Sequence, residues 1–580
     1  MNFNRSNAYH QKETLMMKKM DSSHGIRLSL LALFTLVMGF PTYSQTIGDV
    51  IPADSFLSLK LQNLAACREA IETSSDWDTA SDFITASPKW PAVNQFLQML
   101  PIFFGTDVQG VIESFLGDEI ALSVSPGPAG LLIGIVIQNE GKTASAEQTL
   151  SHLITTLDGM GNKVRRASDT YRDIPYQTTH LNDQEITYGS LNSDIFLVGN
   201  TPECFKKMTD VYKKKRASIT DSSPVYRSAV DRFGKSEVFG FVDVTRAENY
   251  LKALFPPAVS RELEAFQTLV YTWDLLQGGG GLRLYGELAP SRQDTVIPRL
   301  KADATLQTTR VLTGTEDCFI SLSPTCASVL WQALLGSQHT VSELQSFLFP
   351  PAAEIQTALA GEQTLVIDIS SLLLNFSGLY TADINTTQGT IDSVRVKLPQ
   401  LNVGVVFKPD TSEKWQTFFN RSLEKFHAQV SKDEYKGIPF NVASIPGNLY
   451  YGNVTVSEND LFILAFSQKQ FQATVDAVLD ETSTIDLQAR LARIESPPAG
   501  VFLIHLGALI SALAPTNPWI PRETVFFMKT MEPLLASLVV QEESASLDIT
   551  HAADEKGIDA IAKLAPFLFI AITEQTQFGE

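Results

Sequence analysis

The sequence predicts an α+β fold built from two tandem copies of one domain, each with a mainly antiparallel sheet (a β-meander) packed by helices. Two observations lead to this prediction. Similar short segments recur in the same order along the 580-residue chain. Within each copy, alternating apolar runs are separated by turn residues, and the helical segments come in blocks. The steady strand–helix alternation of a parallel sheet is absent.

The recurring segments keep a nearly constant spacing. YRDIPY at 171–176 returns as YKGIPF at 435–440. One such match can arise by chance, but a series in one order indicates duplication, with copies at 45–309 and 310–580. Each copy is long enough to bury its own core. The other matched segments begin at Asp194 and Asp460 (DIFLV and DLFIL) and at Val238 and Val501 (VFGFVDV and VFLIHLG).

Each copy reads as one series of elements: a strand, a partly helical stretch, a strand pair, a helix, a meander, a second helix, a strand, a helical stretch and a last strand. In the second copy a polar insertion at 381–390 is expected to form a loop or a hairpin. The first strands are expected at 55–60 and 318–322, the strand pairs at 119–125 with 131–138 and 363–369 with 401–408, the strands after the second helix at 237–244 and 500–506, the helical stretches at 246–276 and 507–540, and the last strands near 281–287 and 545–550.

The repeated hexapeptide is expected at the start of the meander. Pro175 and Pro439 cannot donate a ladder hydrogen bond, so each should lie at a strand start or on an edge. We expect the tyrosine, isoleucine and second aromatic residue of the hexapeptide to pack the sheet; an aromatic platform for a ligand is the alternative. The core positions expected to be equivalent are Ile195 and Leu197 in the first copy and Leu461 and Ile463 in the second.

Residues 1–44 have the features of a signal peptide. Basic residues precede an apolar run at 28–40, LSLLALFTLVMGF, which is too short to span a bilayer. Cleavage before Gln45 would release a periplasmic or extracellular protein; a membrane anchor or a buried helix is the alternative. The later apolar run at 560–573 is short and interrupted, so we expect no integral membrane span after cleavage.

Composition and charge limit the partners. The chain is 44% hydrophobic and 19% charged, as is typical of a folded globular protein. Its formal net charge of −19 argues against sequence-independent nucleic-acid binding, which needs a basic surface. We expect an unknown envelope or extracellular partner and no nucleic acid.

The residues offer no catalytic, cofactor-binding or metal-binding motif. No HxH or HExxH spacing links the histidines, and no GxSxG occurs. NEGKTAS at 139–145 lacks the glycine cradle of a phosphate loop, and QGGGGLRL at 277–284 is read as a flexible connection before a strand. His505 is read as a core or sheet histidine, with a catalytic role as the alternative. Asp118 and Glu119 are neighbours that face opposite sides of a strand, so we read them as turn or edge residues.

The cysteines Cys67, Cys204, Cys318 and Cys326 are too few for a disulfide framework, and their pairing cannot be read from the sequence. Cys204 falls in the first turn of a predicted helix, where the helix dipole lowers a thiol pKa. It is therefore either a reactive thiol or a half-buried helix residue.

A basic run, KKKR, ends the second helix of the first copy, where the second copy has LDET at 479–482. Basic residues at a helix C-terminus interact favourably with its dipole, by about 0.3–1 kcal/mol each, so a solvated helix end is one reading. Contact with an anionic envelope surface is the other. The candidate surface-contact residues are Lys213, Lys214, Lys215 and Arg216.

Several segments together resemble a family of exported bacterial proteins of unknown function: IPADSFLSL, FLGDEIALSV, YRDIPY, SDIFLVGN and GLRLYGEL. The similarity covers nearly all of the first copy and, more loosely, the second, where GDE becomes GEQ at 361–363. The resemblance implies an envelope or secreted location and brings no catalytic residues.

The leading functional hypothesis is a non-enzymatic exported protein that binds or scaffolds an envelope component. A carrier of an apolar ligand between sheet and helices is the second hypothesis, which a large closed apolar pocket would favour over a filled core. A hydrolase with a site assembled from distant residues is the third.

Overall fold

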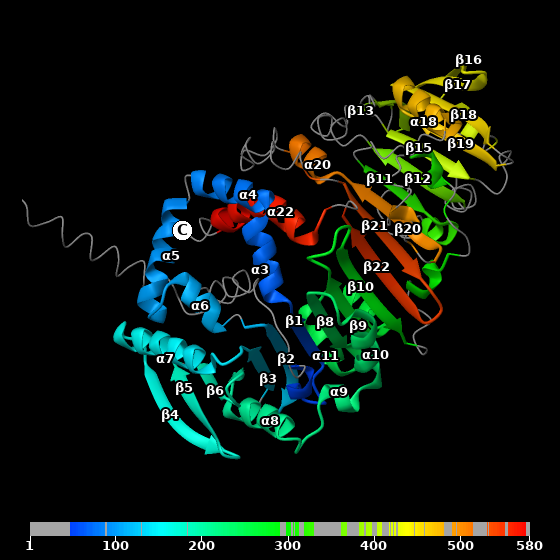
Figure 1. Ribbon diagram of the computed structural model, residues 1–580. Helices are drawn as coiled ribbons and strands as arrows, with labels where there is room; N and C mark the ends of the chain where they lie inside the picture. Colours follow the sequence, from blue (N-terminus) through cyan, green and yellow to red (C-terminus); the bar gives the residue numbers. More distant parts are fainter. Residues whose placement is uncertain are drawn as a thin grey trace, which may run out of the picture. The chain divides into compact units, whose positions relative to one another are not determined.

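A computed structural model gives the fold (Figure 1). It describes residues 47–575 with short gaps and with longer ones at 290–296, 330–360, 368–381, 397–402, 409–416, 481–489 and 514–530. The expected signal peptide therefore lies outside the described residues. The described chain is α+β with mainly antiparallel sheet, which confirms the predicted fold class.

The chain forms two compact units. The first unit comprises the chain up to Ser74 together with Ser87–Val238, and the second comprises Ser75–Ala86 together with the chain from Phe239 onward. A compact unit is defined by contacts, whereas the predicted copies are defined by recurrence of sequence. The copy boundary between residues 309 and 310 stays a prediction.

The first unit contains an antiparallel sheet in the order β1–β2–β3–β7–β6–β5–β4. Hairpins link most neighbours, whereas β3 pairs with β7 across the rest of the meander. The strands are β1 (Leu57–Leu61), β2 (Glu119–Gly127), β3 (Gly130–Gln138), β4 (Val164–Tyr171), β5 (Ile174–Leu181), β6 (Gln184–Ser190) and β7 (Ile195–Gly199).

Helices cover both faces of this sheet (Figure 1). Helix α7 (Thr143–Gly159) shares a buried apolar cluster with Phe196 of β7. On the other face, Gly134 of β3 lies against Met208 of α8 (Pro202–Tyr212). The remaining helices of this unit are η1 (Ile47–Val50), α3 (Leu64–Thr73), α5 (Trp90–Phe104), α6 (Val108–Phe115), α9 (Ile219–Ser222) and α10 (Pro224–Phe233).

The second unit contains an antiparallel sheet in the order β9–β10–β22–β21–β20–β11–β12–β15–β19–β18–β17–β16. The strands are β9 (Phe266–Trp273), β10 (Gly281–Leu288), β11 (Cys318–Leu322), β12 (Glu362–Ile367), β15 (Val403–Lys408), β16 (Gln429–Tyr435), β17 (Ile438–Ile445), β18 (Gly447–Val456), β19 (Asn459–Ala465), β20 (Pro498–Ile504), β21 (Leu534–Val540) and β22 (Ser544–Thr550).

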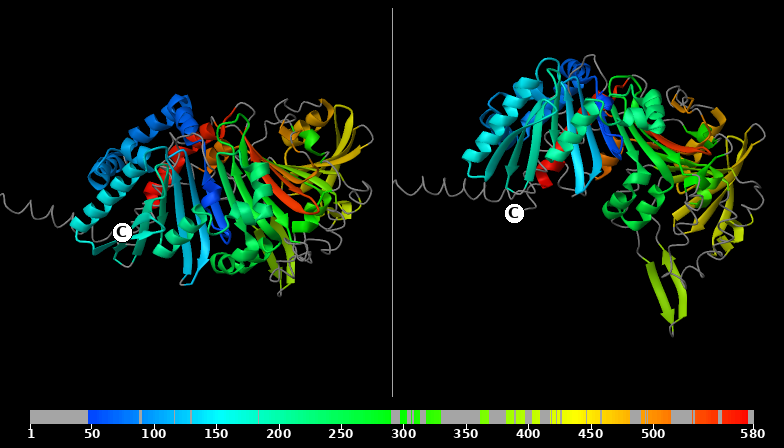
Figure 2. Two further views of the ribbon diagram at one scale, coloured as in Figure 1. Left: turned by 60° about the horizontal axis from the view of Figure 1, so that its bottom comes forward. Right: turned by 90° about the horizontal axis from the view of Figure 1, so that it is seen from below.

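The described residues of the polar segment at 381–390 lie in a separate hairpin, β13 (Ala382–Thr387) with β14 (Thr390–Val396), visible as a two-stranded ribbon in Figure 2. The helices of the second unit include α18 (Gln468–Asp480), which packs on β18 and β19, and the C-terminal α22 (Gly557–Gln575), which packs on α4 (Ser75–Ala86). The others are α11 (Val244–Leu254), α12 (Pro257–Leu263), η2 (Ile297–Leu300), η3 (Thr308–Val311) and α20 (Leu506–Leu513); β8 (Val238–Asp243) begins at the unit boundary.

Strand order and register recur between the units. The order β1–β2–β3–β7–β6–β5–β4 of the first unit has a counterpart in β11–β12–β15–β19–β18–β17–β16 of the second. Leu197 pairs with Val136 on β3, and Ile463 pairs with Val406 on β15. The side chains expected to be equivalent core positions are all buried: Ile195, Leu197, Leu461 and Ile463. The two units therefore share this strand order, and the duplication stays a prediction from the sequence.

The two hexapeptides form matching hairpin turns. Arg172 and Asp173 both have positive φ, as do Lys436 and Gly437, which is the backbone of a two-residue type I′ turn. Each turn joins an edge strand, β4 or β16, to the next strand, so the meander begins one strand earlier than the sequence predicts. The missed strands are almost wholly exposed and carry no apolar alternation that would signal them.

The expected helical stretches at 246–276 and 507–540 are wrong in their last parts. β9 and β21 are strands there, and their buried residues alternate with half-buried ones. Each is rich in β-branched or aliphatic residues and pairs with a strand that the sequence does predict, so sheet packing outweighs the helical pattern of the preceding segment.

Candidate functional site

The predicted basic run curls around the end of α8. Thr201 caps the start of this helix by accepting a hydrogen bond from the Cys204 amide, and the run begins at Lys213, directly after the last helical residue. Lys214 has a left-handed backbone (φ 55°) that turns the chain. The amides of Lys215 and Arg216 then donate to the Asp210 carbonyl at 2.8 and 3.2 Å. This backbone geometry closes the helix without using the basic side chains.

The four side chains of this run, which we call the basic end of α8, are exposed: Lys213, Lys214, Lys215 and Arg216. Among the described residues, none of the ion pairs involves any of them. Lys206, on the preceding turns, lies 5.6 Å from the ring centres of both Tyr171 and Tyr176. The end of α8 is therefore a local concentration of positive charge on an acidic chain.

The first hexapeptide is pinned to the same end of α8. The Tyr171 hydroxyl donates to the Asp210 carboxylate at 3.0 Å, and Arg172 forms an ion pair with it. Tyr176 is buried and its ring stacks on Phe205 with centres 5.0 Å apart. The packing role predicted for the hexapeptide is thus confirmed, and the alternative of an aromatic ligand platform is wrong for the buried Tyr176.

The second hexapeptide makes the same contacts with α18. The Tyr435 hydroxyl donates to Asp476 at 3.1 Å, and Lys436 pairs with Asp476 at 2.9 Å. Phe440 packs on Phe471, with ring centres 4.7 Å apart. In both units a helix aspartate therefore binds a tyrosine and a basic residue of the hexapeptide. Because the contact occurs in both, it is part of the fold that the units share. The basic end belongs to α8 alone.

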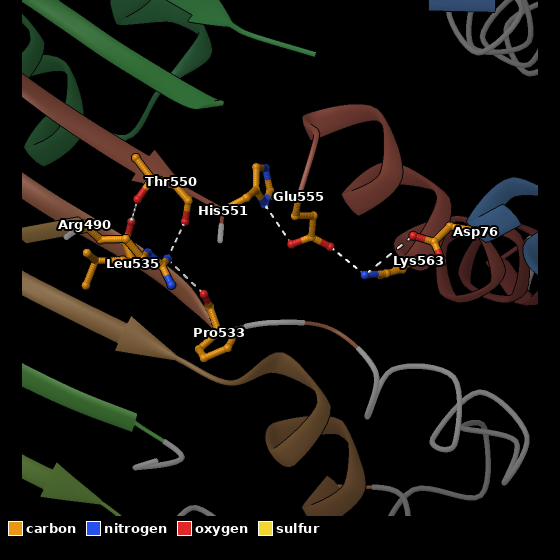
Figure 3. Close-up of polar contacts among 8 residues, drawn as sticks. All are labelled: Asp76, Arg490, Pro533, Leu535, Thr550, His551, Glu555 and Lys563. Carbon is orange, nitrogen blue, oxygen red and sulfur yellow. Dashed lines mark hydrogen bonds and ion pairs between the residues drawn. The ribbon is translucent and has the colours of Figure 1, made fainter. Parts of the chain in front are cut away.

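A second group of ionisable side chains lies in the second unit, three of them buried and two partly exposed, and we call it the ionic cluster: Asp76, Arg490, His551, Glu555 and Lys563 (Figure 3). Glu555 is its centre. One carboxylate oxygen pairs with the Lys563 amine at 2.8 Å, and the other lies 3.9 Å from His551 Nδ1. The Lys563 amine also lies 3.6 Å from Asp76 on α4.

Arg490 anchors the other side of the cluster. Its guanidinium donates to the carbonyls of Pro533, at 3.0 Å, and Thr550, at 2.7 Å (Figure 3). Thr550 is the last residue of β22, so His551 follows directly. Arg490, His551 and Glu555 are each less than one tenth exposed. Buried charges need partners, and Arg490 has these two carbonyls while Glu555 has Lys563.

Burial and the neighbouring cations set the protonation of this cluster. Burial, together with Arg490 and Lys563, lowers the pKa of His551 to about 4, so the imidazole is neutral at pH 7. Burial opposes the charge on Lys563, but the hydrogen bond and charge of Glu555, with Asp76, outweigh it and raise the pKa of the amine. At neutral pH Glu555 is therefore paired with the Lys563 amine, while His551 beside it carries no charge.

The glycine-rich segment at 277–284 supports the ionic cluster. The Gly279 amide donates to the Glu555 carbonyl at 2.9 Å, and the His551 amide faces the Gly280 carbonyl at 3.4 Å. Gly279 has φ +65°, and a side chain at Gly281 would meet the Ile549 carbonyl. The glycines let this segment approach the chain around His551, a packing role that the sequence reading as a flexible connection missed.

The remaining polar candidates have structural roles. His505 Nδ1 faces the Ala508 amide at 3.4 Å, which places it at the start of α20 as a helix cap rather than in a catalytic arrangement. Glu119 pairs with Lys60 at 2.9 Å. Burial, with Glu140, raises the pKa of Asp118 to about 6. Among the described residues, no group of three His, Cys, Asp or Glu side chains could hold a metal ion.

All four cysteines lie in the described part of the chain, and none of them forms a disulfide. Cys204 is 3% exposed, and its sulfur lies 4.0 Å from that of Met208. Burial raises the pKa of Cys204 to about 12, because desolvation outweighs the nearby Lys207. The reading as a reactive thiol is therefore wrong, and the helix start does not activate this sulfur.

We expect Cys67 and Cys204 to resist alkylation in the folded protein. Burial raises the pKa of each to about 12, so at pH 8 almost no thiolate forms. Cys318 and Cys326 are half-buried and should react first with iodoacetamide. Peptide mass spectrometry after a timed reaction checks this order, with urea-unfolded protein as the control in which all four react. Early modification of Cys204 in native protein would contradict the assignment.

No family model and no curated protein matches the chain. Two solved structures, crystal forms IV and III of TP0453, a Treponema protein, are similar to 43% of this chain and 82% of their own. The TM-scores are 0.23 and 0.22, at 9% and 10% sequence identity. Similarity this low carries no functional argument, so the site has to be interpreted from its own residues. No helix within the described ranges combines the length and the apolar character that a membrane crossing needs.

Proposed function

We propose that the chain is an exported, non-enzymatic protein, built from two copies of one α+β domain, that docks on an anionic envelope surface through the basic end of α8. One observation carries the proposal. Four exposed cations stand at the end of α8 without ion pairs among the described residues, on a chain of net charge −19. Export rests on the residues at 1–44, and N-terminal sequencing of the mature protein at Gln45 tests it.

The comparison with α18 separates docking from a purely structural role. Basic residues at a helix C-terminus stabilise it through the dipole by about 0.3–1 kcal/mol each. Yet α18 carries the same hexapeptide contacts, and its last two residues begin the sequence LDET at 479–482, which stands in place of KKKR. The scaffold does not need the basic run, which supports a role outside the fold.

The magnitude of surface attraction favours docking as well. Each lysine or arginine close to an anionic lipid surface contributes about 1 kcal/mol, within a Debye length of about 8 Å at physiological salt. Four neighbouring cations therefore supply about 4 kcal/mol of attraction. That is enough for reversible binding and too little for insertion, which suits a peripheral contact.

The filled cores favour this proposal over a carrier of an apolar ligand. In the second unit the space between the sheet and α18 holds an apolar cluster that includes Phe319, Phe440, Ile463 and Phe471. In the first unit, Tyr188 and Phe196 fill the face under α7. Side chains occupy the places where an apolar ligand would have to bind between these sheets and helices.

Reversing the charge of the basic end should weaken docking. The variant Lys213→Glu/Lys214→Glu/Lys215→Glu/Arg216→Glu should lose at least a hundredfold in affinity for vesicles of phosphatidylglycerol and phosphatidylcholine, because about 4 kcal/mol of attraction is removed. Vesicle co-sedimentation measures the affinity.

The matched control carries the same charge change on other exposed residues of the first unit: Lys142→Glu/Lys163→Glu/Arg227→Glu/Lys235→Glu. This control should lose much less affinity for the vesicles, because those cations are spread along the chain. Equal losses in the two variants would show that net charge alone matters and would refute a docking site at α8. Circular dichroism checks that both variants stay folded.

A further inference from the structure

Polar contacts join helix α4 to the C-terminal helix. Residues 75–86 belong to the second unit, although the chain on both sides of them belongs to the first. Trp77 Nε1 donates to the Ile558 carbonyl at 3.1 Å, and Asp76 faces the Lys563 amine at 3.6 Å. Both partners lie on α22, so the attachment of α4 depends on where α22 is held.

The ionic cluster holds α22. Lys563, one turn and a half into the helix, is fixed by Glu555 at 2.8 Å, and Glu555 belongs to the chain just before the helix. The charged groups that face His551 are Arg490, Glu555 and Lys563. The glycine segment packed against it contributes only backbone, through the Gly280 carbonyl at 3.4 Å.

We propose that the ionic cluster is an acid-sensitive latch, in which a proton taken up by His551 loosens α22 and α4 from the rest of the second unit. The proton adds a third cation beside Arg490 and Lys563, while Glu555 is the only carboxylate within 3.9 Å of the imidazole among the described residues. Glu555 is then shared between His551 and Lys563. When α22 and α4 separate from the rest of the unit, the repulsion among the three cations is relieved, because water solvates the imidazolium.

The direction of the pH effect follows from the burial of His551. The closed latch holds the imidazole neutral, with a pKa of about 4 against 6.5 when it is solvated. Opening is therefore favoured as the pH falls from about 6.5 toward 4, and is unaffected by this group above about 7. Between pH 7.5 and pH 5.0 the open population should rise about 25-fold.

Hydrogen exchange with mass spectrometry on the full chain tests the latch. After correction for the intrinsic exchange rate, protection of peptides from α22 and α4 should fall about 25-fold between pH 7.5 and 5.0. Peptides from β18 and β19 should keep theirs. The measurement has to distinguish peptides of the two units. Asp118, in the first unit, has a pKa raised to about 6, so the stability of that unit should rise rather than fall as the pH is lowered over this range.

Two substitutions remove the titrating group. His551→Gln keeps a polar side chain, and His551→Phe replaces the buried ring, so one of them should fold even if the other does not. In either variant the pH response of α22 and α4 should vanish. His180→Gln is the matched control, since His180 is half-exposed beside Glu185 in the first unit, and it should leave the response intact. A response that persists without His551, or that is uniform across all peptides, overturns the proposal.

Discussion

The Gly117→Ala substitution should lower the free energy of unfolding of the first unit by about 3 kcal/mol. Gly117 is buried two residues before β2, and an added Cβ would meet the carbonyl group of Gln138 and the backbone of Asn139. These are main-chain atoms at the end of β3, which is paired on both sides, with β2 and β7. Neither neighbour can turn away as a flexible side chain would, so the strand pair has to shift.

Gly159→Ala is the matched control. Gly159 is the last residue of α7, and an added Cβ would meet nothing within 4 Å. Alanine there should be neutral or should stabilise by up to about 1 kcal/mol, because it restricts the unfolded chain and favours helix. Urea unfolding measures both variants. Similar stabilities for the two alanine variants would contradict the close approach at Gly117.

The Lys563→Met substitution should cost the second unit about 3 kcal/mol. Methionine preserves most of the volume of lysine but leaves the Glu555 carboxylate buried without its 2.8 Å partner. An unpaired buried charge is the costly outcome of breaking such a pair. The loss should appear as a lower urea midpoint with an unchanged slope.

Two further variants separate charge from packing at this position. Lys556→Met removes a lysine from an exposed position nearby and should change stability by less than about 0.5 kcal/mol. The double variant Glu555→Leu/Lys563→Met removes both charges and should be more stable than Lys563→Met alone. A double variant as unstable as the single one would show that shape, not charge, decides the loss.

Local patterns predicted much of the fold. The meander strands after the hexapeptides alternate apolar and polar residues, so their register and buried faces could be read in advance, as at Leu197 and Ile463. The polar insertion at 381–390 was visible because it interrupts the recurrence. In each case the signal lies within a few residues of the element that it predicts.

The missed strands lacked such a signal. The edge strand β4 is VRRASDTY, with a mostly exposed surface, and it is held by pairing to β5 rather than by an apolar face. The type I′ turn at Arg172 and Asp173 contains no glycine, so it does not resemble the usual turn sequences. β9 was hidden because it follows two helices closely and was read as their continuation.

The two charged sites also differ in whether a local signal predicts them. The four residues of the basic end of α8 are contiguous, so the sequence alone identifies all of them. The ionic cluster joins residues from 76 to 563, and only the folded second unit brings them together (Figure 3). His551 is one of the histidines that no metal-binding spacing links, and nothing in the sequence ties it to Glu555 and Arg490 as buried partners.

The salt dependence of docking tests the central claim most directly. Exposed charges attract over about 10 Å at 0.1 M salt and over about 3 Å at 1 M. The wild-type protein should therefore bind phosphatidylglycerol vesicles at 0.1 M NaCl, release them at 1 M NaCl, and ignore pure phosphatidylcholine vesicles at both. Equal binding to neutral vesicles, or binding to anionic vesicles that 1 M NaCl leaves unchanged, would contradict docking through Lys213, Lys214, Lys215 and Arg216.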